Sequence, residues 1–479
     1  MSFSVRFNRD HRALYPVRPF TSGRGCNRRE VVVKSILSQA ALLERQSLRE
    51  SNARTYPRAM PLAIARAKGV HIWDVDGRQY LDFFAGAGAL ALGHNHPRVQ
   101  EAVRRQLDLV VHALDFPTPT RDAFITELLS VVPESLRQRA RVHICAPTGS
   151  DAVEAAIKLC KCATGRTSML SFTGGYHGMT AGALSVTSLR SVKERVDGLM
   201  PAVQFAPYAH CHSCSLGLTR ERCDIACAAL CESLLGDPLS GVPRPAAAIM
   251  EMVQGEGGSV VPERAFVERV REATRAARVP LIADEVQAGM GRTGKWFAFE
   301  HFGIEPDVIV VSKALGGAGL PIAAIVYDSS LDVWAPGVHI GTFRGHQLAM
   351  AAGIAGMRVM REQEVLQNAR ARGEQLLAGL QQISSPVVSN PRGLGLMVGV
   401  DFRDPDTGKA DPDAAAAVRR ACFDRGLICE LGGRDDATLR LIPPLIVTRE
   451  QVDQALQIIC ESIRAVHSAF DSALSEKVA

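Results

Sequence analysis

Apolar runs alternate with helical segments from about residue 142 to residue 330, and this alternation constrains the fold more than any other feature of the chain. The runs are RVHICAPTG, TSMLSFTGG, AAAIMEMVQGEGG, VPLIADEV, DVIVVSKALGG and PIAAIVYD. Short apolar strands separated by helices are typical of βαβ units, in which helices cover a mostly parallel sheet. We therefore expect an α/β fold with a ligand site at the carboxyl ends of the strands.

The length of 479 residues allows two or three domains. We expect a flexible tail and first helix over residues 1–45, and an N-terminal segment over residues 46–95 that packs with a small domain. A large α/β domain is expected over residues 96–375, and a small α+β domain over residues 376–479. Within them, DVDGRQ predicts a hairpin with Asp-Gly at its tip, and a long helical stretch over residues 347–383 is expected to break near Gly373.

Composition indicates an ordinary globular protein, with 47% hydrophobic and 22% charged residues. The net charge of +5 is weak support for nucleic-acid binding, and we expect none. Much of the positive excess lies in the first 30 residues, which we interpret as a tail, with a transit peptide as the alternative. No apolar run approaches the roughly 18–20 residues that span a bilayer, so no membrane partner is expected.

The chain has twelve cysteines, and five gather in one short segment. That segment contains His210, Cys211, His212, Cys214, Cys223, Cys227 and Cys231. Its C-x2-C-x8-C-x3-C spacing is close to that of zinc sites, but we expect reduced structural thiols and commit to no metal. Zinc binding and redox activity stay open as alternatives. Reduced thiols in a chain of this length also lead us to expect a cytoplasmic protein.

Two charged residues end neighbouring apolar runs: Asp284 ends VPLIAD, and Lys313 ends VIVVSK. Burying a charge costs free energy unless the charge is paired. A lysine in apolar surroundings loses its proton more easily and forms a Schiff base with an aldehyde, and a buried carboxylate keeps a ring nitrogen protonated. Both demands are those of pyridoxal 5′-phosphate. We expect this cofactor here, although a lysine after a strand is more often a surface residue.

The stretch APTGSDAVEAAIKL predicts a strand, a tight turn and the start of a helix. Backbone N–H groups at a helix start bind anions, so we expect Gly149 and Ser150 to hold a phosphate. Ser150 or Asp151 is expected to cap the helix. An ordinary helix cap without a ligand is the alternative interpretation.

Tyr176 follows two glycines in SFTGGYHGMT, at the expected end of a strand. This position suits an aromatic side chain that stacks on a flat ring, with plain packing as the alternative. We interpret the next residue, His177, as a structural hydrogen-bonding residue without a chemical role.

A series of stretches over about residues 50–465 resembles, in the same order, class III (omega-type) aminotransferases of the pyridoxal-phosphate fold type I. They include PTGSDAVEAAIKL, SFTGGYHGMT, EMVQGEGG, LIADEVQAGMGRTG, VSKALGG and GTFRGHQLAMAAG. FFAGAGALALGHNHP, PTGSDAVEAA and GTFRGHQLAM are most similar to the diaminobutyrate–2-oxoglutarate branch. The resemblance implies a large domain with a mostly parallel sheet flanked by helices, and a smaller α+β domain.

The resemblance implies a role for each residue around the cofactor. Lys313 is expected to form the Schiff base and to move the substrate proton, and Asp284 to pair with the ring nitrogen. Val286 and Tyr176 are expected to cover the two faces of the ring, and Gln287 to approach its phenolic oxygen.

The resemblance also implies a homodimer with active sites at the subunit interface. Thr342, in GTFRG, is expected to reach the phosphate bound in the neighbouring subunit. Arg440, in TLRLIPPL, is expected to grip the α-carboxylate of glutamate or 2-oxoglutarate. Glu256, in VQGEGG, is expected to pair with Arg440 when an amine without that carboxylate is bound. Arg344 is placed near the site, for a second carboxylate.

We therefore expect a transaminase that moves an amino group between an amino acid or a diaminobutyrate-like terminal amine and an oxo-acid such as 2-oxoglutarate, in a ping-pong reaction. Small-molecule amines and oxo-acids are its expected partners. Three alternatives stay open: decarboxylation or an intramolecular amino shift on the same scaffold, a pathway-specific aldehyde acceptor, and a protein that holds the cofactor without turnover.

Overall fold

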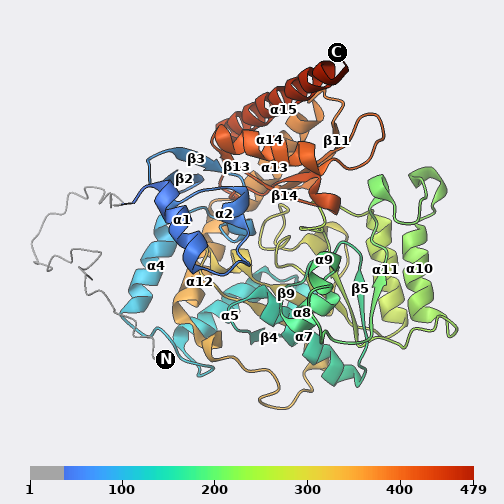
Figure 1. Ribbon diagram of the computed structural model, residues 1–479. Coiled ribbons are helices and arrows are strands. Elements are labelled where there is room, and N and C mark those ends of the chain that lie inside the picture. The colour runs from blue at the N-terminus through green and yellow to red at the C-terminus, as the bar shows by residue number, and fades with distance from the viewer. Residues whose placement is uncertain (1–36, 479) are drawn as a thin grey trace, which may run out of the picture. The chain divides into compact units, whose positions relative to one another are not determined.

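The structure, a computed structural model, describes residues 37–478, and the Arg-rich tail predicted before them lies outside these residues. The strands form a central seven-stranded sheet and two four-stranded sheets (Figure 1). The central strands are β4 (Ala140–Ile144), β5 (Met169–Phe172), β6 (Val203–Ala206), β7 (Ala247–Glu251), β8 (Leu281–Asp284), β9 (Val308–Val311) and β10 (Ala324–Asp328). Over the described residues, no helix is long and apolar enough to cross a membrane.

The central sheet has the order β4-β10-β9-β8-β7-β5-β6. The pairs β9·β8, β8·β7, β7·β5 and β5·β6 are parallel, whereas β10 runs antiparallel to both of its neighbours. The predicted α/β class with a mostly parallel sheet is therefore confirmed. The strand β6 was not among the predicted apolar runs, since its sequence VQFA is short and mixed.

Helices cover both faces of this sheet, which explains why its strands are apolar throughout. Ile249 and Ile282 face a core that includes the buried face of α7, whereas Met250 and Ala283 face a larger core. Burying each large aliphatic side chain stabilises the fold by about 1.5–3 kcal/mol. The helices before and around the sheet are α4 (Pro97–Leu107), α5 (Pro119–Val131), α6 (Glu134–Arg137), α7 (Gly149–Thr164), α8 (Ala181–Val186), α9 (Arg190–Lys193), α10 (Ala226–Gly236), α11 (Arg264–Ala276) and α12 (Gln347–Glu362).

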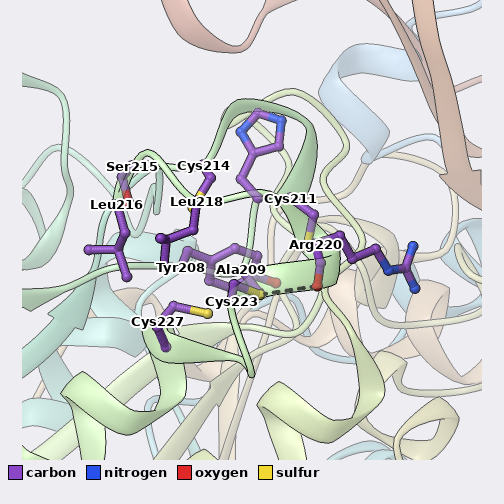
Figure 2. Close-up of a pocket in the computed structure, with 12 residues that line it drawn as sticks. Tyr208, Ala209, Cys211, Cys214, Ser215, Leu216, Leu218, Arg220, Cys223 and Cys227 are labelled. Carbon is purple, nitrogen blue, oxygen red and sulfur yellow. Dashed lines mark hydrogen bonds between the residues drawn. The ribbon is translucent and has the colours of Figure 1, made fainter.

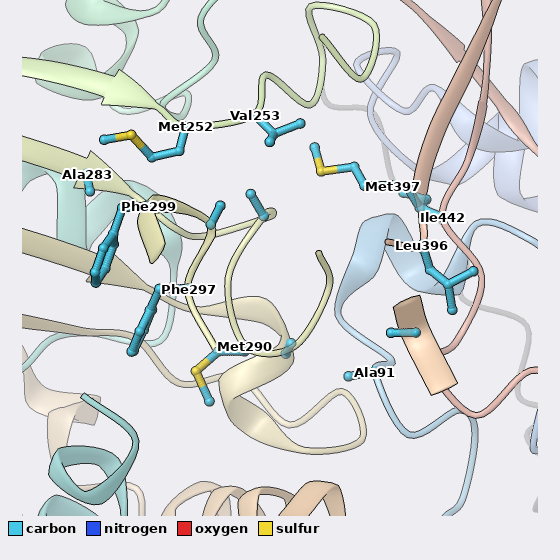
Figure 3. Packing of buried hydrophobic residues seen from close by; sticks show 14 of the residues in the cluster. Ala91, Met252, Val253, Ala283, Met290, Phe297, Phe299, Leu396, Met397 and Ile442 are labelled. Atoms are coloured by element: carbon cyan, nitrogen blue, oxygen red, sulfur yellow. The ribbon is translucent and has the colours of Figure 1, made fainter. Parts of the chain in front are cut away.

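The larger core continues from the central sheet into the C-terminal part of the chain. Figure 3 shows Ala283 of β8 and Phe299 in the same cluster as Met397 and Ile442. The C-terminal sheet has the order β11-β12-β15-β14. Its strands and helices are β11 (Val388–Leu394), β12 (Met397–Phe402), β14 (Glu430–Gly432), β15 (Thr438–Leu441), α13 (Val365–Gln381), α14 (Pro412–Asp424) and α15 (Arg449–Val478).

The N-terminal elements form the third sheet, in the order β1-β2-β3-β13. The predicted Asp-Gly hairpin is present, because β2 and β3 pair antiparallel on either side of Gly77. β3 also pairs in parallel with β13, so the N-terminal segment joins the C-terminal one. The elements are α1 (Gln39–Arg49), α2 (Tyr56–Ala59), β1 (Ile64–Lys68), β2 (His71–Asp74), β3 (Gln79–Asp82), α3 (Ala85–Gly88) and β13 (Leu427–Ile428). The domain boundaries proposed at residues 95 and 375 stay a prediction.

The predicted helix break near Gly373 is wrong. The break lies at Gln363 and Glu364, where Glu364 adopts a left-handed conformation with φ of 52°. Gly373 lies inside α13, where a Cβ would come within 2.0 Å of the carbonyl oxygen of Gly395. The glycine therefore permits a close approach of helix and loop, which a sequence pattern does not distinguish from a break.

Candidate active site

A cavity of about 160 Å³ lies at the carboxyl ends of β7, β8 and β9. It is lined by Gly149, Ser150, Tyr176, His177, Gly178, Glu251, Glu256, Asp284, Val286, Gln287 and Lys313. The structure thus brings together all of the predicted site residues except Thr342, Arg344 and Arg440. Three residues that line it were given no chemical role from the sequence: His177, which was interpreted as a structural hydrogen-bonding residue, Gly178 and Glu251.

Lys313 enters the cavity from the turn after β9. Its backbone has φ of 46°, in the left-handed region that a lysine rarely adopts, so the fold holds this residue in a strained conformation. Burial lowers the pKa of its amine below the ordinary value, and the nearby carboxylate of Glu256 opposes this effect only partly. Burial thus shifts the amine toward its neutral form, which is the form that accepts a proton or attacks a carbonyl.

Asp284 is fixed by two hydrogen bonds at the end of β8. His177 Nδ1 lies 2.7 Å from its Oδ2, and the backbone N–H of Val286 donates to its Oδ1 at 3.0 Å. His177 is itself held through its backbone N–H, which donates to Thr187 Oγ1 at 2.8 Å. Both the imidazole and the carboxylate are buried. The arrangement orients a carboxylate toward the cavity and leaves it little freedom to turn.

The start of α7 lines the cavity with Gly149 and Ser150. Thr148 Oγ1 caps the helix by accepting from the backbone N–H of Asp151, so the predicted cap at Ser150 or Asp151 is wrong. Ser150 Oγ instead accepts from Met179 N at 3.2 Å. A Cβ on Gly149 would lie 3.0 Å from Val286 Cγ1, which explains the glycine. A sixteen-residue helix thus presents its positive end to the cavity.

Arg440 reaches the cavity's edge from β15 and is buried, with 1% of its surface exposed. Its Nη1 lies 2.8 Å from Glu256 Oε2, and its Nη2 donates to Gln287 Oε1 at 2.9 Å. Burial raises the pKa of Glu256, but the charge of Arg440, together with hydrogen bonds from Arg440 and Gln287, leaves its pKa below the ordinary value. Glu256 and Arg440 therefore form an ion pair at the edge of the cavity.

Thr342 and Arg344 lie outside the cavity of their own chain. Both belong to the short 3-10 turn Thr342–Gly345, where Thr342 is exposed. Arg344 donates to the carbonyl oxygen of His339 at 3.1 Å and pairs with Asp115. The structure therefore does not bring these two residues to the site formed by one chain.

His177 and Glu251 have a recognisable sequence signal. Glu251 ends the apolar run AAAIME, just as Asp284 ends LIAD, and the two residues are paired in register between β7 and β8. Polar residues that end adjacent buried parallel strands gather at one edge of the sheet. His177 follows the candidate ring-stacking residue Tyr176 directly, in the turn after another strand of the same sheet.

The donor set of the cavity fits pyridoxal phosphate. An amine of lowered pKa suits an aldehyde, a fixed buried carboxylate suits a protonated ring nitrogen, and a helix N-terminus with Ser150 suits a phosphate. Tyr176 and Val286 line the same cavity and offer an aromatic and an apolar surface for a ring. No side chain in the set conflicts with the chemistry of the cofactor.

The cysteine-rich segment lines a different pocket. Figure 2 shows Cys211, Cys214, Cys223 and Cys227 around a pocket of about 20 Å³, and all four are free thiols. Burial raises the pKa of Cys211, and that of Cys227 to about 11, which keeps these thiols protonated. Among residues 37–478, no three potential ligands are arranged to hold a metal ion.

Residues 52–463 match the family described as aminotransferase class-III, and the chain belongs to this family of enzymes. It is 45% identical to a diaminobutyrate–2-oxoglutarate aminotransferase of Rhizobium meliloti, over 87% of this chain and 90% of the relative. It is 44% identical to the enzyme of the same name from Haemophilus influenzae, over 91% and 99% of the two chains. The fold matches ornithine aminotransferase from Toxoplasma gondii, with a TM-score of 0.77, 26% identity, and coverage of 90% and 95%.

Proposed function

We propose that this aminotransferase uses pyridoxal 5′-phosphate to transfer an amino group between diaminobutyrate and 2-oxoglutarate. The main support for this cofactor is that Lys313, Asp284 and the N-terminus of α7 line one cavity. The substrates are those named for relatives that are 44–45% identical over most of both chains. The Arg440–Glu256 pair supports a site that must accept two kinds of substrate.

Lys313 carries the proton in this proposal. When bound, pyridoxal phosphate supplies an aldehyde that captures amines and a ring that withdraws electrons from the reacting carbon. Burial lowers the pKa of the Lys313 amine. In the proposed reaction its Nζ takes a proton from the reacting carbon and returns it to the adjacent position. Burial favours this role because it shifts the amine toward the neutral form that accepts a proton.

The remaining cavity residues position the cofactor. Asp284 accepts the ring N–H, and the bond from His177 holds its carboxylate in that orientation. Tyr176 and Val286 cover the two faces of the ring and exclude water. The backbone N–H groups at the start of α7 and the hydroxyl of Ser150 hold the phosphate.

Arg440 and Glu256 give the two half-reactions their different substrates. The reacting carbon of glutamate carries a carboxylate, which the forked guanidinium of Arg440 binds. The carbon that bears a terminal amine has no carboxylate. Without a partner, the buried charge of Arg440 would then cost free energy. Glu256 pairs with Arg440 in that case and releases it when a carboxylate enters. The structure shows the paired arrangement, at 2.8 Å.

A second copy of the chain completes the site in this proposal. Large exposed apolar side chains gather on two segments, 107–116 and 338–343, with Leu109 76% and Phe343 61% exposed. The two segments are adjacent, because Ala113 N donates to the carbonyl oxygen of Gly345 and Gln347 N to that of Val111. An apolar surface of this kind marks a protein interface. It also carries the exposed Thr342, which we propose reaches the phosphate bound by the partner subunit.

Free thiols throughout the described cysteines are those of a reducing compartment, and we propose a cytoplasmic enzyme. Fractionation of the cells that express the chain tests this location directly. Recovery in a secreted fraction with cysteines in disulfides would contradict it.

Cofactor absorbance tests the proposed reaction. Purified holoenzyme mixed with diaminobutyrate is expected to lose the absorbance of the lysine-bound aldehyde and gain that of the aminated cofactor, and 2-oxoglutarate is expected to reverse the change. Release of carbon dioxide in place of an oxo-acid would assign a decarboxylase. A spectrum that no amine changes would show a protein that binds the cofactor without turnover.

A further inference from the structure

The carboxylate of Glu251 lies beneath the cavity, between the two loops that contribute Tyr176 and Glu256. It ends β7, directly beside Asp284 of β8, and is 5% exposed. Its own backbone is anchored, since the hydroxyl of Tyr208 donates to the Glu251 carbonyl oxygen at 3.0 Å. Glu251 lines the cavity but has no role in the reaction described above.

Both oxygens of this carboxylate accept backbone N–H groups, one from each loop. Tyr176 N donates to Oε2 at 2.9 Å, and Gly255 N donates to Oε1 at 3.0 Å. Tyr176 is the proposed ring-stacking residue, and Gly255 immediately precedes Glu256. The side chain of Glu251 therefore fixes the backbone of two segments. One holds Tyr176, and the other holds Gly255, next to Glu256.

The two loops also contact each other directly. Gln254 Nε2 donates to the carbonyl oxygen of Thr173 at 2.9 Å. A Cβ on Gly257 would lie 2.7 Å from the carbonyl oxygen of Gly174. The bonds to Glu251 therefore lie at the centre of a contact that extends along both loops.

We propose that Glu251 is a positioning residue that couples the ring-stacking Tyr176 to the Glu256–Arg440 pair, and thereby sets the balance between the two half-reactions. This inference rests on the proposed function. Glu251 touches no reacting atom in it and acts through the two backbone N–H groups. When these bonds are intact, Glu256 is held where it pairs with Arg440, and a terminal amine without a carboxylate is accepted.

The substitution Glu251→Gln tests this coupling, because glutamine keeps the size of the side chain but replaces one of the two acceptors with a donor. Loss of one backbone hydrogen bond is expected to lower the ratio of the diaminobutyrate to the glutamate half-reaction rate by about 3- to 10-fold. Release of pyridoxal phosphate is expected to accelerate by a similar factor. Stopped-flow cofactor absorbance gives both half-reactions, and dilution into a cofactor trap gives the release rate.

Glu285 offers a matched control. It is also buried, and its two oxygens accept the backbone N–H groups of Ala298 and Phe299 at 2.8 and 3.0 Å. These donors lie in a turn outside the cavity. Glu285→Gln is therefore expected to lower the melting temperature, as Glu251→Gln does, but to leave the ratio of half-reactions and the release rate unchanged.

A double-mutant cycle separates positioning from general damage. Because Glu251 acts through Glu256, the effect of Glu251→Gln on the ratio is expected to shrink in a Glu256→Gln background. Equal slowing of both half-reactions, additive effects in the cycle, or a changed ratio in the Glu285→Gln control would overturn the inference. A wild-type enzyme that converts neither substrate would instead refute the proposed function. The shorter Glu251→Asp variant, which keeps the charge, provides a second test with the same expected direction.

Discussion

The cofactor end of the cavity is built from one sheet, whereas the substrate end joins two. Asp284 and Lys313 follow adjacent parallel strands, so the hydrogen bonds of β8 and β9 fix their separation. Glu256 and Arg440 come from a loop after β7 and from β15 of another sheet, and one ion pair joins them. In the proposed reaction, the chemistry therefore depends on positions that one sheet holds rigidly, whereas the choice of substrate depends on a single ion pair between two parts of the chain.

The largest expected effect is at the rigid end. Lys313→Ala removes the amine that moves the proton, and turnover is expected to fall by at least about 10³-fold. Turnover is measured as the rate at which glutamate forms from diaminobutyrate and 2-oxoglutarate. Lys313→Arg is the matched control. It keeps a long basic side chain, but its guanidinium stays protonated and cannot replace the amine. Turnover of either variant within tenfold of the wild type would contradict the role of Lys313.

Asp284→Asn is expected to reduce turnover by about 10²-fold, because the amide keeps the shape but no longer stabilises a protonated ring nitrogen. His177→Gln, which removes the imidazole that orients Asp284, is expected to have a smaller effect in the same direction. The order of these two losses, measured as kcat under saturating substrates, checks whether His177 acts through Asp284. A larger loss for His177→Gln would reverse that assignment.

At the adjustable end, Arg440→Ala is expected to affect one substrate far more than the other. Loss of a charged hydrogen-bonding partner is expected to raise the KM for 2-oxoglutarate by about 10- to 100-fold. The half-reaction with diaminobutyrate, whose reacting carbon needs no such partner, is expected to change less. Steady-state kinetics with each substrate varied in turn gives the two values. Equal changes would show that the two ends of the cavity are not separable.

The smallest effect on activity is expected for Glu285→Gln. Glu285 follows Asp284 in the sequence but does not line the cavity. Burial raises the pKa of Glu285 to about 8, so the folded chain holds a proton that the unfolded chain releases above its ordinary pKa of 4.5. Its contribution to stability is therefore full below about pH 4.5 and is lost as the pH rises through 8. Glutamine does not titrate. The melting temperature of the variant, relative to that of the wild type, is therefore expected to rise from pH 5 to pH 8. A constant difference across this range would contradict the raised pKa.

Sequence patterns located the rigid end of the site better than the adjustable end. Asp284 and Lys313 are visible because each ends an apolar run, and adjacent parallel strands bring such residues together. Arg440 and Glu256 were assigned by resemblance only, since no local pattern predicts an ion pair across 184 residues of chain, from position 256 to position 440. Glu251 obeys the same rule as Asp284, but its bonds to two loops depend on tertiary packing.

Errors at the ends of helices have a similar physical origin. Thr148 caps α7, whereas Ser150 lies inside the first turn, where its hydroxyl accepts a bond from Met179 of another segment. Glu364, and not Gly373, interrupts the long helix, because a close contact with Gly395 needs a glycine inside the helix. Both choices are made by tertiary neighbours, which single-sequence propensities do not contain.

Reductive labelling of the holoenzyme tests the central claim most directly. Borohydride converts a Schiff base between a lysine and the cofactor aldehyde into a stable amine, which mass spectrometry of the digested chain then locates. We predict one labelled peptide, modified at position 313, and none after preincubation with diaminobutyrate. A label on any other lysine, or a chain that takes up no cofactor, would contradict the account.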